Sequence, residues 1–107
     1  MNDAIQVITA AGSREEARTI ATAIVEQHLA ACVQVIGPIS STYWWQGQME
    51  TAEEYLCLMK TSRKIFTTLE MAIREVHSYE TPEILAMPVV EGSEDYLYWM
   101  RGQLRGQ

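Results

Sequence analysis

The stretch that decides the fold is residues 31–61, ACVQVIGPISSTYWWQGQMETAEEYLCLMKT. Both halves are rich in β-branched and aromatic residues, and a glycine-centred turn, Gln46-Gly47-Gln48, lies between them, which predicts one β-hairpin. Each arm has a dozen or more residues and would span roughly 40 Å at about 3.3 Å per residue. A compact domain of this length has a diameter of only about 35 Å. The hairpin is therefore expected to project beyond its own domain.

The far end of this hairpin carries three consecutive aromatic residues, Tyr43, Trp44 and Trp45. Each has roughly 150–250 Å² of surface to bury, and together they exceed the few hundred Å² of apolar patch that a soluble monomer usually exposes. Trp44 and Trp45 could form a platform on which a ligand stacks, but an oligomer contact is the better interpretation. We therefore expect the three aromatic residues to form an interface with another copy of the chain.

The segment before the hairpin predicts a strand and a helix. Residues 5–9 are a short apolar run, typical of a buried strand. Ser13 followed by Glu16 makes a capping box that would open a helix, and the helix is expected to end near His28, a surface or cap residue. Apolar residues recur at helical spacing between these points: Ala17, Ile20, Ala21, Ile24 and Val25. Within the first hairpin arm, Pro38 predicts a bend or bulge, because proline cannot donate to a central ladder.

The segment after the hairpin predicts a helix, a strand and a final helix. Ser62 is expected to cap the second helix, and residues 84–90 to form a fourth strand with Pro88 at an edge or bulge. Glu94 and Asp95 suit the start of a third helix. The expected buried sides are Ile65, Phe66, Leu69, Ala72, Ile73 and Val76 in the second helix, and Leu97, Met100 and Leu104, beside Trp99, in the third.

The order of elements is strand, helix, strand, strand, helix, strand, with one more helix at the end. This order predicts an α+β fold, a ferredoxin-like split βαβ sandwich in which two helices pack on one face of a four-stranded antiparallel sheet. With 107 residues, the chain is expected to be a single domain, residues 1–107.

Composition excludes several classes of partner. The net charge of −6 argues against nucleic acid and is compatible with cation binding. No apolar run approaches the roughly 20 residues of a membrane span, and the first residues, Met1-Asn2-Asp3-Ala4, do not resemble a secretory signal. With the turn at Gly47, Cys32 should face a residue near Thr61 and lie too far from Cys57 for a disulfide. Two reduced thiols fit a cytoplasmic protein.

Candidate chemistry is concentrated in the polar loop after the second helix. Enzyme signatures are absent, which favours a protein without catalytic activity. The loop holds His77, Tyr79, Glu80 and Glu83, and imidazole beside carboxylates suits copper or zinc, with the Cys32 thiolate favouring Cu(I). Alternatively, Glu80 caps backbone donors and Tyr79 packs in a purely structural loop, or His77 and Glu80 serve an unknown enzyme as acid and base.

Lys60 offers a second candidate position. It ends the second hairpin arm next to Ser62 and could hold an anion at the helix N-terminus. The alternative is an ion pair with Glu54 or Glu83.

Five motifs in order resemble the CutA divalent-cation tolerance family. They are Ala30-Ala31-Cys32; Ser41-x-Tyr43-x-Trp45-x-Gly47; Glu54 with Lys60-Thr61; His77-x-Tyr79-Glu80-x-Pro82-Glu83; and Tyr96-Leu97-x-Trp99. The resemblance implies a homotrimer of ferredoxin-like subunits in which long hairpins pair with neighbours, and a role in tolerance to copper and other divalent cations. We expect ligand or metal binding in clefts between subunits, lined by Cys32, Trp45, Lys60, Tyr79 and Glu80, with His77 as the metal ligand.

Two departures from the family pattern weaken the copper inference. Some members carry a cysteine where this chain has Ile8-Thr9, and a histidine pair where it has Val76-His77. A metal site here would depend on His77 alone among these positions. The main alternative is a signalling trimer that resembles the nitrogen-regulatory PII proteins and binds a small molecule between subunits, although no long basic, glycine-rich phosphate loop is present.

Overall fold

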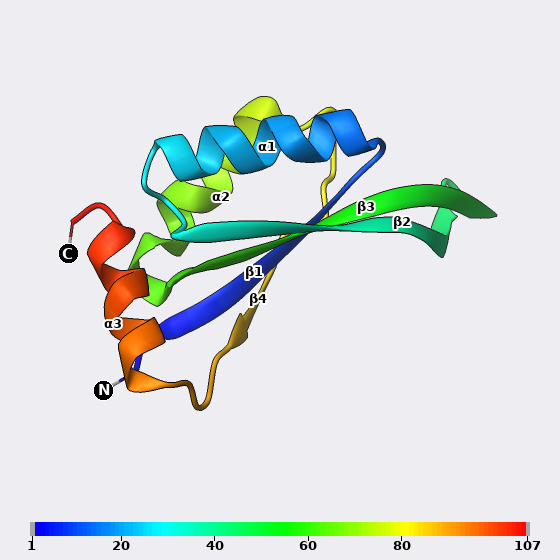
Figure 1. Cartoon of the computed structure of the whole chain (residues 1–107). Helices are drawn as coiled ribbons and strands as arrows, with labels where there is room; N and C mark the ends of the chain where they lie inside the picture. The colour runs from blue at the N-terminus through cyan, green and yellow to red at the C-terminus, as the bar shows by residue number, and fades with distance from the viewer. Residues whose placement is uncertain (1, 107) are drawn as a thin grey trace.

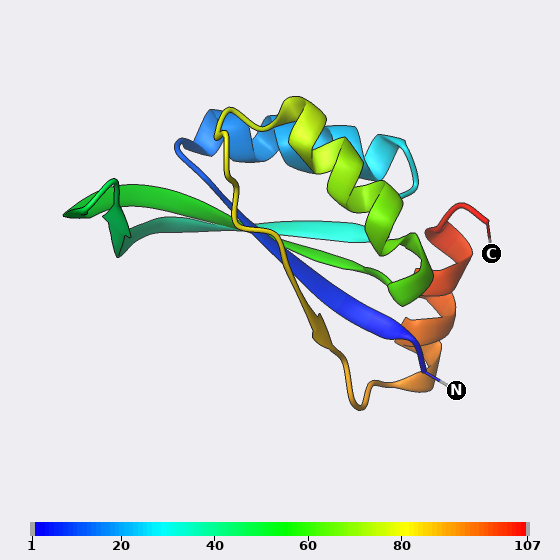
Figure 2. The same ribbon diagram turned by 180° about the vertical axis from the view of Figure 1, so that it is seen from behind.

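The computed structural model describes residues 2–106 and has the expected α+β architecture (Figure 1). Its four strands form one antiparallel sheet in the order β2-β3-β1-β4. Helices α1 and α2 lie together over one face of this sheet, and α3 lies at one end (Figures 1 and 2). The elements are β1 Ala4–Ala11, α1 Arg14–Glu26, β2 Cys32–Trp45, β3 Gln48–Ser62, the short 3-10 helix η1 Arg63–Ile65, α2 Phe66–Val76, β4 Leu85–Pro88 and α3 Glu94–Gln103.

The hairpin of β2 and β3 projects well past the rest of the molecule, as predicted (Figure 2). The molecule measures 44 × 25 × 22 Å along its principal axes, and the far half of the hairpin accounts for the long one. Gln46 and Gly47 form the turn with φ of 49° and 80°, as a two-residue turn between twisted strands requires. Trp44, next to the turn, is 74% exposed.

A bulge divides the hairpin at Gly37-Pro38, confirming the interruption predicted from Pro38. The register shifts by one residue between Ile36 and Ile39, and Cys32 lies opposite Lys60, next to Thr61, as expected. Cys57 lies opposite Val35, and both cysteines are free thiols, as predicted.

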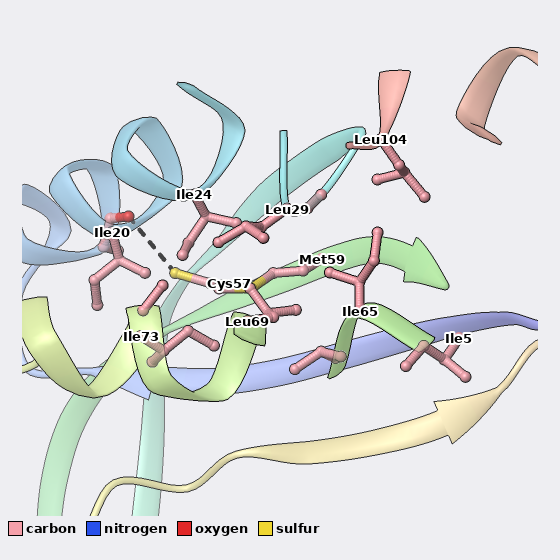
Figure 3. Close-up of a cluster of buried hydrophobic side chains, with 14 of the residues drawn as sticks. Ile5, Ile20, Ile24, Leu29, Cys57, Met59, Ile65, Leu69, Ile73 and Leu104 are labelled. Atoms are coloured by element: carbon pink, nitrogen blue, oxygen red, sulfur yellow. Dashed lines mark hydrogen bonds between the residues drawn. The ribbon is translucent and has the colours of Figure 1, made fainter. Parts of the chain in front are cut away.

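The core lies between the helix-bearing face of the sheet and helices α1 and α2 (Figure 3). Fully buried side chains from α1, α2 and β3 meet there, and the Cys57 S–H donates to the Ala17 carbonyl oxygen at 3.6 Å. Most of the predicted apolar positions are buried, but Val25 and Val76 are exposed, at 39% and 37%. The central side chains are Ile20, Ile24, Leu29, Met59, Leu69 and Ile73.

Ser62 does not cap a helix, contrary to prediction. It is the last residue of β3, its side chain makes no capping hydrogen bond, and its buried Oγ has no partner within residues 2–106. The segment continues as η1, so α2 starts only at Phe66.

Three further expectations in this part of the chain are corrected. The fourth strand is shorter than predicted, Leu85–Pro88, although Pro88 does lie on an edge strand. In α3, Met100 is buried, whereas Leu97 is only half-buried. Lys60 forms no ion pair with Glu54 or Glu83, and its ammonium group donates instead to Gln6 Oε1 on the neighbouring strand β1.

The opposite face of the sheet is covered by no helix of the described chain (Figures 1 and 2). The strand register aligns apolar residues across it: Ile8 lies opposite both Leu58 and Leu85, and Ile36 lies opposite Leu56. Ile36 and Leu85 are 49% and 56% exposed. We call this surface the open sheet face.

Candidate ligand cleft

A cavity of about 340 Å³ lies where the projecting half of the hairpin meets the loop between α2 and β4. Tyr43 and Trp45 on β2 share a face with Glu54 on β3, because side chains alternate along each strand and the pairing places these positions in phase. The loop supplies the opposite wall. The full lining is Ala10, Tyr43, Trp45, Glu54, Tyr79, Glu80, Thr81 and Glu83, and we call this cavity the cleft.

A hydrogen bond between Tyr79 and Glu54 joins the two walls of the cleft. The Tyr79 hydroxyl donates to Glu54 Oε2 at 2.9 Å, and Glu54 is only 8% exposed. Burial and this hydrogen bond to Glu54 raise the pKa of Tyr79 well above its usual value, so the phenol stays a donor. The ring crosses Gly12, where a Cβ atom would lie 3.2 Å from the Tyr79 hydroxyl. Glycine at this position therefore leaves room for the ring.

His77 holds the start of the loop against β1. Its Nε2 lies 2.8 Å from the Ala10 carbonyl oxygen, which only accepts, so Nε2 carries the proton. Its Nδ1 accepts the Tyr79 backbone N–H at 3.1 Å. The side chain is buried and both ring nitrogens are occupied. This geometry does not support the expected metal-ligand role of His77, because a ligand nitrogen must present a free lone pair.

Glu16, at the start of α1, fixes the same loop from the other side. Its Oε2 accepts the Ser78 backbone N–H at 2.7 Å, and its Oε1 accepts the Gly12 N–H at 3.2 Å. Burial raises the pKa of the Glu16 carboxyl, but the hydrogen bonds from Ser78 and Gly12 outweigh burial and leave the pKa below its ordinary value. The predicted N-cap is confirmed, since Ser13 Oγ accepts the Glu16 N–H at 3.1 Å, but the capping box is incomplete because the Glu16 carboxylate bonds the Gly12 N–H instead of the Ser13 N–H. Glu16 thus links the cap of α1 to the cleft loop.

The structure brings together only part of the predicted site. Trp45, Tyr79 and Glu80 line the cleft with Tyr43, whereas Trp44 lies on the opposite side of its strand. Cys32 and Lys60 pair with each other at the base of the hairpin, where β2 begins and β3 ends, and do not line the cleft. In residues 2–106, no three histidine, cysteine, aspartate or glutamate side chains lie close enough together to hold a metal ion.

Glu54, Ala10 and Thr81 line the cleft, although the sequence did not predict them there. The sequence identified Glu54 only as a position in a family motif and as a possible ion-pair partner of Lys60. Its even spacing from Glu50, the partner of Tyr43 across the hairpin, is the signal that could have placed it on the cleft face.

Comparison with known proteins identifies the family. The sequence model of the CutA1 divalent ion tolerance protein family matches residues 5–103. The chain belongs to this family. The match favours the CutA resemblance over the PII alternative.

Individual CutA proteins are similar over most of the chain. The divalent-cation tolerance protein CutA of Thermus thermophilus is 43% identical over 95 residues, which cover 89% of this chain and 92% of that protein. The rice protein CutA 1, chloroplastic, is 33% identical and is matched over 94% of this chain but only 57% of its own length. The solved structure of the periplasmic divalent cation tolerance protein CutA from Archaeoglobus fulgidus superposes with a TM-score of 0.91 at 36% identity, covering 94% of this chain and 97% of that one.

The names of these relatives place them in different compartments, chloroplast and periplasm. Family membership therefore leaves the compartment of this chain undetermined. Within residues 2–106, no helix is long and apolar enough to cross a membrane.

Proposed function

We propose that this CutA1-family chain is a homotrimeric, non-enzymatic protein of divalent-cation tolerance that binds its ligand in the cleft, at the boundary between subunits. The observation that carries the proposal is the position of the cleft beside two uncovered apolar surfaces. One is the open sheet face, and the other is the hairpin tip, formed by Tyr43, Trp44 and Trp45. Soluble monomers rarely expose large contiguous apolar patches. Further copies of the chain are the simplest cover, since most soluble oligomers are symmetric assemblies of identical subunits.

Covering these surfaces would also close the cleft. Tyr43 and Trp45 are 41% and 47% exposed, and they line the cleft on the hairpin half that projects from the subunit. A neighbouring subunit packed against the hairpin would shield these rings and supply further side chains to a ligand. The cleft of one chain is then one part of a larger binding site.

A divalent cation bound there would rely on carboxylate oxygens. Glu54, Glu80 and Glu83 are the ionisable groups that line the cleft besides tyrosine, and such oxygens favour hard divalent ions. Copper, the ion that the family resemblance implies, prefers nitrogen and sulfur ligands. Both ring nitrogens of His77 are engaged by Ala10 and Tyr79, so a copper site would need ligands from a neighbouring subunit. The half-exposed Cys32 is the thiol available for such a site.

The free thiols also support the proposed cytoplasmic location. Cys32 and Cys57 are both unpaired, and unpaired cysteines are typical of reducing compartments.

Two measurements test this proposal. Sedimentation equilibrium should give a trimer at micromolar concentration, and a folded monomer would overturn the assembly. Calorimetric titration with Cu(II), Zn(II) and, under reductant, Cu(I) should show binding that weakens in Glu54→Gln, with the exposed Glu91→Gln as a matched control. His77→Gln preserves a donor toward Ala10 and should leave metal affinity unchanged. Loss of all metal binding in His77→Gln, with the trimer intact, would restore His77 as a ligand.

Incubation with common metabolites tests the enzymatic alternative. Turnover that disappears in His77→Gln would overturn the non-enzymatic assignment.

A further inference from the structure

The cleft is lined by three carboxyl side chains, Glu54, Glu80 and Glu83, and by no basic side chain of the described residues. Glu54 is more than nine-tenths buried, yet only its Oε2 has a hydrogen-bond partner within residues 2–106, the Tyr79 hydroxyl. A buried carboxylate is costly unless it is paired. Glu54 Oε1 is not a fully buried atom, so a positively charged group that enters the cavity can pair with it.

Two basic side chains of the neighbouring elements β3 and α1 are engaged elsewhere. The Lys60 ammonium group donates to Gln6. The Arg14 guanidinium lies over the Tyr55 ring, 4.9 Å from its centroid, and donates to the Gly37 carbonyl oxygen at 3.4 Å. Within residues 2–106 Glu54 has no ion pair, so a positive partner for it would come from a ligand or from a neighbouring subunit.

Aromatic rings form the other part of the cleft wall. Tyr43, Trp45 and Tyr79 line the cavity with Glu54, and each ring keeps between 37% and 47% of its surface exposed. The face of an aromatic ring attracts a cation within about 6 Å of its centre, most strongly when the cation is a poorly hydrated ammonium group. Aromatic rings are the usual recognition elements in sites that bind quaternary ammonium compounds.

The arrangement suits an organic cation better than a bare metal ion. The carboxylates of residues 2–106 do not converge in a group of three on one ion-sized point, whereas direct coordination of a metal needs several ligands at 2.0–2.6 Å. The cavity of about 340 Å³ is at the lower end of the range for small-molecule pockets. Aromatic walls stabilise alkyl groups, which a metal ion does not have.

We propose that the cleft binds a small alkylammonium ion, with its positive nitrogen near Glu54 and its alkyl groups on Trp45 and Tyr43. Glu80 and Glu83 on the loop add negative charge around the entrance. This inference rests on the cleft being the ligand site of the proposed function, and it does not depend on the cleft binding a metal. A basic side chain from a neighbouring subunit could occupy the same position, and the experiment separates that case.

The test is calorimetric titration of the assembled protein with choline, with n-butylammonium, and with 3,3-dimethyl-1-butanol, the neutral counterpart of choline. We expect saturable binding of one or both ammonium probes and none of the neutral alcohol. Comparing choline with n-butylammonium distinguishes a quaternary from a primary ammonium site.

Two variants locate the bound cation. Glu54→Gln and Trp45→Leu should each weaken binding at least tenfold, whereas Glu91→Gln, outside the cleft, should have no effect. Sedimentation of each variant checks that assembly is unchanged. If Glu54→Gln alters assembly, Glu83→Gln on the exposed loop replaces it and should weaken binding about threefold.

Three outcomes would overturn the proposal. These are no binding of either ammonium probe at 10 mM, equal binding of the neutral alcohol, and an affinity unaffected by Glu54→Gln and Trp45→Leu. The first outcome in an intact trimer would indicate that a neighbouring side chain fills the cleft. Metal titration and sedimentation are measured separately, so failure here leaves the trimer and the metal proposal standing.

Discussion

Replacing Tyr79 by phenylalanine should loosen the cleft loop and measurably destabilise the protein. The substitution removes only the hydroxyl that donates to Glu54 Oε2 at 2.9 Å and leaves the ring on Gly12 in place. A hydrogen bond to a charged group contributes about 1.5–3 kcal/mol. Because Tyr79 is 37% exposed, water can partly replace the lost donor, so we expect a loss of about 1–2 kcal/mol in the free energy of unfolding.

Urea unfolding at fixed protein concentration measures this loss, because the apparent stability of the proposed trimer would depend on concentration. For a domain of about 100 residues, each 1 kcal/mol lowers the melting temperature by roughly 4–8 °C. The matched control is Tyr98→Phe, whose ring is 77% exposed and should change the free energy of unfolding by less than about 0.5 kcal/mol.

A double-mutant cycle with Glu54→Gln isolates the pair itself. If the hydroxyl stabilises the protein through Glu54, the effects of the two substitutions should be non-additive by about 0.5 kcal/mol or more. Additive effects, or a Tyr79→Phe protein as stable as Tyr98→Phe, would refute the view that this bond holds the two cleft walls together.

The remaining predictions concern the bulge, the loop anchor and the two thiols. Gly37→Ala should destabilise the protein by about 1–3 kcal/mol in urea unfolding, because its Cβ would lie 2.4 Å from the Tyr55 ring; wild-type stability would contradict this packing. Folding lowers the pKa of Glu16, so its contribution is complete above the unfolded value of about 4.3 and is lost as pH falls through the folded pKa. The stability advantage of wild type over Glu16→Gln should therefore shrink below about pH 4.3, and a constant difference would count against it. Burial raises the pKa of Cys57 to about 11, so iodoacetamide at pH 8 should leave Cys57 unmodified in the native Cys32→Ser protein and label it only after unfolding. Dithiothreitol should not change the melting temperature, since both thiols are free; a drop of several degrees would reveal a disulfide.

Features set by near neighbours in the chain were predictable from the sequence. Alternating β-branched and aromatic residues around Gly47 define the hairpin, because strand pairing across a two-residue turn is a short-range property. The Ser13–Glu16 capping-box pattern gave the start of α1 for the same reason. Family motifs spread over most of the chain then identified the relationship that the match to residues 5–103 establishes.

Tertiary structure decided where α2 begins and which polar groups lie in contact. Ser62 has the residue type of a helix cap, but pairing with Ala4 keeps it in β3. His77 has the chemistry of a metal ligand, but its contact with Ala10, 67 positions earlier in the chain, fixes the proton on Nε2, and the Tyr79 N–H occupies the lone pair of Nδ1.

The cleft itself depends on contacts that no local pattern encodes. Glu54 and Tyr79 meet across 25 residues, and Glu16 reaches Ser78 across 62. The bulge at Gly37 shifts the strand register by one residue and places Lys60 opposite Cys32. Side-chain spacing along a strand determines which residues share a face, but only the packing of distant segments determines what that face encloses.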